Sequence, residues 1–414
     1  MIYRFDTKCP GCSSPIGLRI SRGRHSDQPF FYVCSVCNVA TRGSLQVNEQ
    51  EMALELEDGE LFDLDPTVEQ VYTLDPGFPT PSDARSMSDD GGSPFLFNSA
   101  ILGERFPEYS HRVSGFYDFY ENSWLKLKRL TQFFLDSNWQ RFDALLVEII
   151  DSEPTEITDL IRYDSIYRFY DIALASMAVY PLHAEMRKEW NGLFIPTGNH
   201  AEEIAAYQEG IISDPEYLQS RKSLFGCLQD YIELGDALIP GIAIEMYPLH
   251  HSQYGDLRIY RDNFPVLRDL YVQSFEACIQ ALTFVIESLN VIKRGNPHSY
   301  LDQAGIRQTP RTRAQFNRLT AEKKLLFLSE LPLWESTWNS SLDRQSRNKI
   351  GHRQIHHDLS SGTLRREGQD DIPYIDFIQS AQRVFYPIVG CLNALKIAEI
   401  HHLIRVKNEN AEST

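Results

Sequence analysis

The spacing of hydrophobic residues predicts a chain that is helical over most of its length. From about Glu108 onward, apolar side chains recur every three or four residues, as they do on one face of an α-helix. The clearest run comprises Phe116, Phe119, Tyr120, Trp124, Leu127, Leu130 and Phe134. Further stretches with this period are 139–150, 157–179, 264–292, 313–338, 342–352 and 374–405. Pro332 predicts a break and Pro387 a kink, because proline removes a helical hydrogen bond.

Near the N-terminus the pattern is different. The short apolar runs 16–20 and 30–33 predict two strands, and each stands next to a pair of cysteines. These pairs, Cys9-Pro-Gly-Cys12 and Cys34-Ser-Val-Cys37, have the spacing C-x2-C-x21-C-x2-C. Each turn places two thiolates on one side of a metal, and the two turns together complete a tetrahedron. This region resembles a zinc ribbon, and we expect a closed, structural zinc site.

Two disulfides or a redox-active cysteine pair are the alternatives to zinc. Disulfides are rare inside cells, and no βαβ pattern surrounds either pair, so zinc is the favoured interpretation. The remaining cysteines, Cys227, Cys278 and Cys391, lie in apolar helical segments and are expected to be buried.

Turn-rich acidic sequence separates the cysteine region from the helical region. Residues 44–100 carry thirteen Asp/Glu and only one basic residue, Arg85, which is typical of an extended linker. The expected organisation is mainly α, with a zinc ribbon over 1–47, an acidic linker over 48–103, a helical middle domain over 104–261 and a C-terminal helical bundle over 262–414.

Composition and charge narrow the class of protein. The 414 residues are 42% hydrophobic, which excludes a disordered chain, and no span of about 18 to 20 apolar residues predicts a membrane helix. We therefore expect a cytoplasmic protein with no membrane partner. The net charge is −17, but residues 1–43 carry six Lys/Arg against two Asp/Glu, and 263–414 carry 19 against 16. A local basic patch governs phosphate contact, so a nucleic-acid partner is not excluded.

The candidate catalytic residues stand in one hexapeptide, Arg347-Asn348-Lys349-Ile350-Gly351-His352. A histidine can take and give a proton near neutral pH. An arginine can hold a phosphate and stabilise the charge that develops on its oxygens. The pair therefore suits phosphodiester cleavage. A helix-end histidine beside a solvated arginine is the alternative.

The context of this hexapeptide resembles the HEPN superfamily of helical ribonucleases. That family has an R-x4–6-H signature with a polar residue, often Asn, after the Arg, and here a hairpin-like segment, 360–366, and a final amphipathic stretch follow the motif. The resemblance covers about 262–405. It implies a helical bundle that dimerises or forms a higher homo-oligomer, a composite metal-independent RNase site, and roles as a toxin or in antiviral defence and abortive infection. Arg347, Asn348 and His352 carry over as catalytic residues, and Glu287 is a possible acidic member.

Two rival functions remain open. One is a catalytically silent helical module that binds RNA or a protein. The other is a metal-dependent hydrolase that uses His352, His356, His357 and Asp358, although no H-E-x-x-H motif or further carboxylates accompany them. Basic residues that suit a phosphate track are Lys293, Arg294, Arg307, Arg311, Arg313, Arg318, Lys323 and Lys324. A second basic group, at the expected ribbon hairpin, is Arg19, Arg22, Arg24 and His25. No P-loop or G-x-G-x-x-G sequence supports nucleotide hydrolysis.

Overall fold

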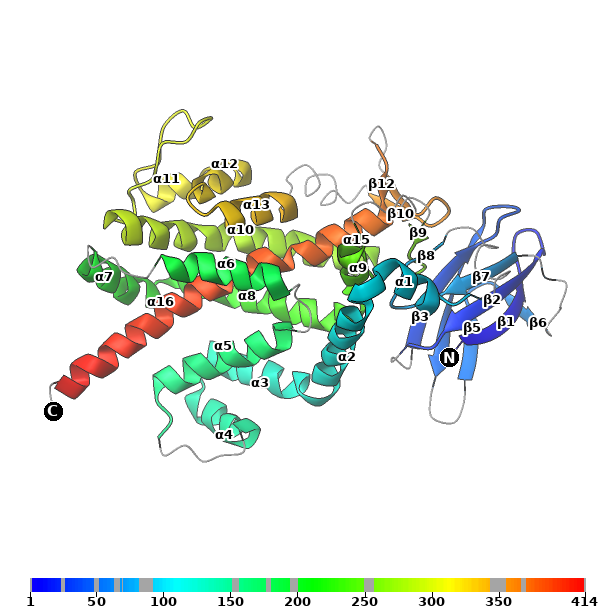
Figure 1. The fold of residues 1–414 in the computed structure, drawn as a ribbon, viewed down its shortest axis with the longest axis horizontal. Helices are drawn as coiled ribbons and strands as arrows, with labels where there is room; N and C mark the ends of the chain where they lie inside the picture. The colour runs from blue at the N-terminus through cyan, green and yellow to red at the C-terminus, as the bar shows by residue number, and fades with distance from the viewer. Residues whose placement is uncertain are drawn as a thin grey trace. The chain divides into compact units, whose positions relative to one another are not determined.

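A computed structural model of the chain shows a mainly helical protein with a small N-terminal β region, which confirms these two features of the expected fold class (Figure 1). The structure describes residues 2–23, 27–47, 52–62, 68, 70–81, 92–150, 156–175, 180–193, 200–248, 257–342, 355–365 and 370–412. The chain divides into two compact units, and the layout of four domains stays a prediction. The first unit comprises Met1–Val113, Glu233–Asp269 and Lys349–Gln382, and the second comprises Ser114–Ile232, Leu270–Asn348 and Arg383–Thr414.

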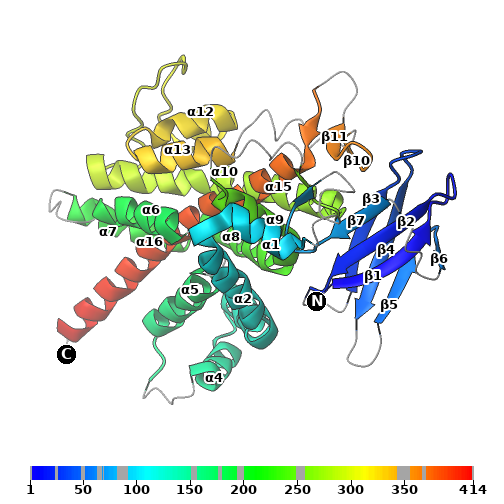
Figure 2. The same cartoon turned by 45° about the vertical axis from the view of Figure 1, so that its right-hand side comes forward.

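The first unit contains the β-strands. They are β1 (Ile2–Lys8), β2 (Pro15–Ser21), β3 (Asp27–Val33), β4 (Ala40–Val47), β5 (Met52–Leu56), β6 (Glu60–Phe62), β7 (Gln70–Leu74), β8 (Thr80–Pro81), β9 (Leu257–Arg258), β10 (His356–Asp358), β11 (Thr363–Arg365) and β12 (Ile372–Pro373). One sheet has the order β6-β1-β2-β7 and another the order β3-β4-β5 (Figure 2). β10-β11-β12 form a third sheet, and β8 pairs with β9. The two expected strands are therefore present as β2 and β3, in different sheets.

A single core joins the first two sheets. Alternate residues of β2, Ile16, Leu18 and Ile20, are almost fully buried, and so is the apolar run at the end of β3. The same core includes Tyr260, just after β9, and Leu359, in the turn between β10 and β11. Segments far apart in the sequence thus meet around the N-terminal sheets.

Within the stretch expected as an acidic linker, 48–103, the described residues include regular secondary structure. This stretch contains β5, β6, β7 and β8, and the helix α1 (Pro94–Leu102). β7 completes the first sheet by pairing in parallel with β2, and its residues Tyr72 and Leu74 are buried. The sequence pattern did not predict these short strands, because acidic and turn-forming residues also dominate solvated loops.

The other helical elements are η1 (Gly103–Arg105), α2 (Phe106–Asn122), α3 (Trp124–Leu135), α4 (Trp139–Ile150), α5 (Asp159–Ala175), α6 (Tyr180–Gly192), α7 (Ala201–Ile212), α8 (Pro215–Glu233), α9 (Gly235–Met246), α10 (Phe264–Arg294), α11 (Arg313–Asn317), α12 (Ala321–Leu325), η3 (Leu326–Leu328), α13 (Pro332–Ser341), α15 (Tyr374–Arg383) and α16 (Phe385–Glu412). Within the second unit, α16 packs against α5, α6, α7 and α13. Trp190 of α6 and Trp334 of α13 are fully buried against each other. This apolar packing supplies the core of the helical unit.

Most of the expected helices are confirmed. The stretch 139–150 coincides with α4, 264–292 lies within α10, and Pro332 begins α13 as the expected break. The kink expected at Pro387 is a break at Val384, between α15 and α16. Pro387 lies in the first turn of α16. Backbone N–H groups in the first turn of a helix have no intrahelical acceptor, so a proline there removes no helical hydrogen bond. The helix expected over 342–352 falls almost entirely outside the described residues.

Helix α10 corrects the expectation that no segment of the chain is apolar enough to cross a membrane. Its 31 residues are long and apolar enough to cross a membrane by length and composition alone. However, 83% of its most apolar window is buried inside the protein. This burial is typical of the central helix of a folded core. The three scattered cysteines Cys227, Cys278 and Cys391 are also buried, as expected.

Candidate functional site

The four N-terminal cysteines lie in two turns of the same geometry. Cys9 follows β1 and Cys34 follows β3, and each turn leads into the next strand. In the first turn the Ser13 N–H donates to the carbonyl of Cys9 at 2.9 Å, and in the second the Asn38 N–H donates to that of Cys34 at 2.8 Å. Ser13 and Asn38 both have a positive φ, near 60°, which reverses the chain after the second cysteine. Each C-x2-C sequence therefore forms a tight knuckle.

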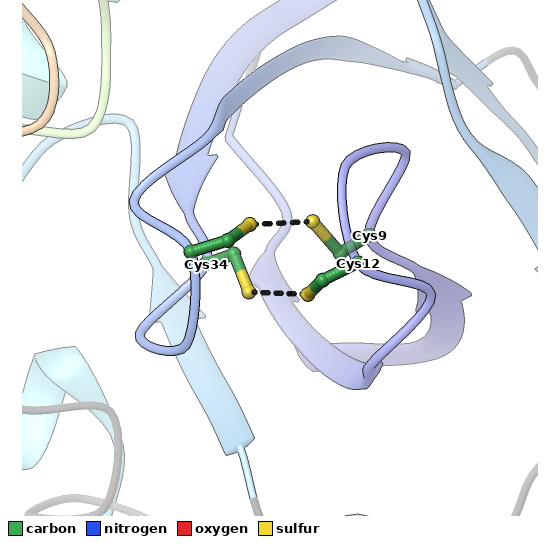
Figure 3. Close-up of side chains that lie close together, drawn as sticks. Cys9, Cys12 and Cys34 are labelled. Atoms are coloured by element: carbon green, nitrogen blue, oxygen red, sulfur yellow. Dashed lines mark hydrogen bonds between the residues drawn. The ribbon is translucent and has the colours of Figure 1, made fainter.

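The two knuckles face each other, so the four sulfur atoms converge (Figure 3). The Sγ atoms of Cys9 and Cys37 are 3.4 Å apart, those of Cys12 and Cys34 are 3.6 Å apart, and all four lie within 4.8 Å of one another. A tetrahedral site with metal–sulfur bonds of about 2.3 Å separates its sulfurs by about 3.8 Å. The seven cysteines are free thiols, so the disulfide alternative is not formed here. The cluster could hold one metal ion.

The surroundings of the sulfurs differ. Cys9 and Cys34 are buried in the core, whereas Cys12 is exposed. Hydrogen bonding by Ser14 lowers the pKa of Cys12 to about 6. A backbone hydrogen bond at Val39 lowers the pKa of Cys37, but the neighbouring thiols and burial outweigh it and raise that pKa to about 12. Such opposed shifts arise because thiolates this close repel one another, and a bound cation would remove the repulsion.

Further polar groups orient the cysteine turns. The Gly11 N–H donates to Sγ of Cys9 at 3.4 Å. Gln70 of β7 accepts a hydrogen bond at 3.1 Å from the N–H of Ser35, which lies inside the second knuckle. A Cβ on Gly11 would come within 2.8 Å of a Val39 methyl group in the second knuckle, so a larger residue there would have to displace the Val39 side chain. Hydrogen bonds of this kind around the ligands are common in metal sites.

The hexapeptide with Arg347, Asn348 and His352 lies outside the described residues. The structure describes its two flanks. On one side Leu342 is buried at the end of α13, and on the other Ile355 is buried just before β10. The hairpin-like segment expected after the motif is present as β10 and β11, which pair from His356 with Arg365 to Asp358 with Thr363. The motif is therefore connected on both sides to buried chain.

The histidine cluster differs from the metal alternative considered above. That alternative uses His352, His356, His357 and Asp358 together, but the three described residues, His356, His357 and Asp358, form the strand β10. Adjacent residues in a strand point to opposite faces. Accordingly, His356 is exposed, whereas the His357 side chain is only 2% exposed. Among the described residues, the four cysteines are the one group placed to bind a metal.

His357 instead takes part in a buried polar contact that the sequence analysis missed. Its Nδ1 lies 3.0 Å from Oδ1 of Asp262, and Oδ2 of Asp262 accepts a hydrogen bond from Arg42 at 2.9 Å. Burial raises the pKa of Asp262, but the hydrogen bonds from His357 and Arg42 outweigh it and hold that pKa below its usual value. No sequence spacing connects these residues, which come from three distant segments.

The expected basic track divides into two groups. Lys293 and Arg294 form ion pairs with Glu330, Arg313 pairs with Glu287 and Asp214, and Lys324 is buried. The other four, Arg307, Arg311, Arg318 and Lys323, are exposed and form no ion pair within the described part of the chain. Of the eight residues of the track, these four have charges open to an outside anion.

Glu287, the possible acidic member, lies in a buried polar network of the second unit. Its side chain is completely buried, and both of its oxygens accept hydrogen bonds from Arg313, at 2.8 and 2.7 Å. The hydroxyl of Tyr207 donates to it as well, at 3.1 Å. Burial and the Glu287 charge raise the pKa of Tyr207 well above its usual value. The network joins α7, α10 and α11.

The second basic group, near the N-terminal sheets, is only partly described. Arg19 lies in β2 and donates to the carbonyl of Gly92 at 2.8 Å. Arg22 lies just after β2, and Arg24 and His25 fall outside the described residues. Arg19 is therefore engaged within the protein.

The helical unit also contains a cavity of about 320 Å³. Its lining residues are Phe119, Asn122, Ser123, Lys126, Leu127, Ile149, Phe169 and Ile172. Lys126, the one charged lining residue, pairs with Glu148 at 3.0 Å, and Ile172 is 62% exposed. This is an apolar surface hollow without an acid–base pair or a set of metal ligands.

In comparisons with known proteins, no family model, no curated protein and no solved structure matches the chain.

Proposed function

We propose that this protein is a metal-independent endoribonuclease of the HEPN type. The observation that carries the proposal is the hexapeptide from Arg347 to His352, which combines a proton carrier with a phosphate clamp and leads directly into the β10–β11 hairpin. His352 acts as general base or acid while the 2′-hydroxyl of the RNA attacks the adjacent phosphate. Arg347 stabilises the charge on the phosphate oxygens, and Asn348 orients the site.

The features around the hexapeptide support RNA as the substrate. Four exposed cations, Arg307, Arg311, Arg318 and Lys323, belong to the same C-terminal segment and have no internal partner among the described residues. Exposed cations of this kind bind a phosphate backbone without regard to sequence. The biological role we propose is that of a toxin or an effector of antiviral defence and abortive infection, in the cytoplasm.

The metal proposed for the cysteine cluster is zinc. Four thiolates at tetrahedral spacing are the ligand set of structural zinc sites. Such a site is closed, since no coordination position remains for water or substrate. Zinc would therefore supply folding energy to the first unit and no catalytic step.

A second candidate is an RNA-binding module without activity. The same four exposed cations favour it, because binding needs only these charges, whereas cleavage also needs His352. The two proposals differ in a single result, the cutting of RNA.

A nuclease assay on single-stranded RNA tests the proposal. We expect the wild type to cut RNA in EDTA, and His352→Ala to be about 10²–10⁴-fold slower, since it lacks the acid–base group. Arg347→Lys should also be slow, by at least about tenfold, because a point charge cannot replace the planar guanidinium. His356→Ala is the matched control: it removes an exposed histidine four residues away and should keep full activity.

Three results would count against the ribonuclease. Cleavage that persists in His352→Ala would assign the activity to another site. A requirement for added Mg²⁺ or Mn²⁺ would favour a metal-dependent hydrolase. Binding of RNA without cleavage by any variant would favour the silent module.

A further inference from the structure

The core around the cysteine cluster extends to the β10–β11 hairpin. Cys9 and Cys34 belong to the same buried cluster as Phe31 of β3, Tyr260 after β9 and Leu359 of the hairpin turn. The Phe31 ring contacts both Tyr260, with centroids 5.6 Å apart, and His357, edge-on at 5.8 Å. All these residues belong to the first unit. The hairpin that follows the hexapeptide is thus packed on the strand that carries the second cysteine knuckle.

Hydrogen bonds reinforce this packing on both strands next to the knuckle. Phe31 and Arg42 are directly opposite each other in the β3–β4 pair, and Phe31 is three residues before Cys34. The Phe31 N–H donates to the carbonyl of Tyr260 at 3.0 Å. Arg42 donates to Asp262 at 2.9 Å. Strands β3 and β4 therefore hold the segment 260–262 at two points.

Asp262 also contacts the β10–β11 hairpin, through His357. Its Oδ1 lies 3.0 Å from Nδ1 of His357, and the His357 ring packs at a tilt against Tyr374 with centroids 3.9 Å apart. The Tyr374 hydroxyl accepts a hydrogen bond from the N–H of Asn263 at 3.2 Å. His357 is almost completely buried, so a broken contact with Asp262 would leave an unsatisfied polar group inside the protein. The hairpin accordingly has one favoured position.

The strength of this connection depends on the cysteine turns. A metal bound by four cysteines links the turn before β2 to the turn before β4, and its binding energy is folding energy for both. Without it, the two turns lose the bonds that join them across the cluster. Loosening β3 and β4 would remove Phe31 and Arg42 from their contacts with Tyr260 and Asp262.

We propose that the metal held by the four cysteines fixes the β10–β11 hairpin through Arg42, Asp262 and His357, and that metal loss releases it. His357 is a positioning residue in this arrangement. It stands five residues after His352 in the sequence, so we expect metal loss to affect RNA cleavage as well. The consequence for RNA cleavage rests on the proposed function. The structural coupling does not.

Hydrogen exchange of the full chain, read by mass spectrometry, tests the coupling. Removing the metal with a strong chelator should speed exchange in a peptide covering 356–365 by at least about tenfold. In the metal-free protein the Asp262–His357 contact is already lost, so opening of the hairpin no longer has to break it. A peptide covering α13, Pro332–Ser341, belongs to the other unit and should be unchanged. Metal content is measured on each sample.

A pair of adjacent substitutions gives the matched control. In His357→Gln the hairpin should exchange fast even when one metal per chain is bound. His356→Gln changes the exposed neighbour on the same strand and should exchange as the wild type does. If His357→Gln fails to fold, Arg42→Gln replaces it, since the Arg42 side chain is 49% exposed and its loss leaves the core intact. It should likewise speed hairpin exchange with metal bound.

The coupling is overturned if the hairpin stays protected after metal removal while β3 exchanges freely. It is also overturned if the metal-loaded His357→Gln or Arg42→Gln hairpin exchanges as slowly as that of the wild type. Cleavage of RNA is measured in parallel. Coupling without any cleavage would sink the ribonuclease and leave this inference standing. Cleavage of RNA by a protein whose hairpin exchange does not change on metal removal would overturn this inference and leave the ribonuclease standing.

Discussion

Arg313 illustrates how the environment of a single residue decides its role. The sequence groups it with seven other basic residues as a phosphate track, yet its guanidinium pairs with Glu287 and Asp214. The completely buried Glu287 needs a cation, because an unpaired charge in the core is costly. Arg313 is therefore satisfied inside the protein, and Arg311, two residues earlier, is left exposed. Residue type alone does not distinguish these two arginines.

The ion pair between Arg313 and Asp214 predicts a pH dependence. Burial raises the pKa of Asp214, but the hydrogen bond from Arg313 outweighs it and lowers that pKa below its usual value. A depressed folded-state pKa gives stability that is present above the unfolded pKa and is lost as the pH falls through the folded one. Asp214→Asn should therefore lower the urea midpoint at pH 7, and the difference from wild type should shrink toward pH 3. A difference that stays constant with pH would argue against this pair.

At the scale of secondary-structure elements, a buried ion pair joins three helices of the second unit. Arg221 of α8 donates to Glu399 of α16 at 2.7 Å, and Tyr167 of α5 donates to the other oxygen at 2.8 Å. The exposed fractions are 7% for the Arg221 side chain and 0% for Glu399. The pair fixes the rotation of α16 about its axis, because Glu399 must face Arg221 and Tyr167 to accept these hydrogen bonds.

Removing one partner of this pair should be strongly destabilising. Glu399→Ala leaves the Arg221 charge buried and unpaired, at a cost of about 3–5 kcal/mol in the free energy of unfolding. The matched control is Glu409→Ala, further along α16, where the carboxylate is 62% exposed. Its loss should cost under about 1 kcal/mol. Urea denaturation followed by circular dichroism measures both, and equal effects of the two substitutions would refute the assignment.

The two cysteine knuckles act together as one element. We expect about one zinc per chain, and loss of that zinc in Cys34→Ser, since three thiolates no longer close the tetrahedron. Cys227→Ser changes a buried cysteine of the helical unit and should keep the metal. Metal analysis by plasma mass spectrometry on both variants measures this. A folded wild type without zinc would contradict the structural role.

Helices could be predicted from this sequence far better than the partners of its strands. The period of apolar residues located α4 and α10 almost to the residue, because each helix buries one continuous face. Strand pairing depends on residues distant in sequence, so β7 could not be assigned to β2. The cysteine site was predictable because four ligands in two short turns specify it locally.

At the scale of the whole molecule, long-range contacts escaped prediction for the same reason. Asp262 and His357 are 95 residues apart, and neither stands in a motif that indicates the other. Histidine next to histidine suggested metal ligation, whereas the strand β10 turns the two side chains to opposite faces. The hexapeptide from Arg347 to His352 remains a sequence-based candidate for catalysis, as it lies outside the described residues.

Self-association is a prediction that belongs to this scale. One chain supplies one Arg347 and one His352, and the proposed composite site uses two of each. We expect a homodimer or higher oligomer through residues 262–405 at the concentrations of the cleavage assay. Analytical ultracentrifugation at those concentrations measures the mass. A strictly monomeric chain with full activity would contradict the composite site.

The chemistry of the cleaved ends tests the central claim most directly. Attack by the 2′-hydroxyl of the RNA, with His352 moving the proton, predicts a 2′,3′-cyclic phosphate and a 5′-hydroxyl in EDTA, and an intact chain where a single 2′-deoxy nucleotide replaces the cleaved position. Mass spectrometry of the fragments from wild type and His352→Ala identifies these ends. Products with a 5′-phosphate and a 3′-hydroxyl, formed only with added divalent metal, would contradict the mechanism.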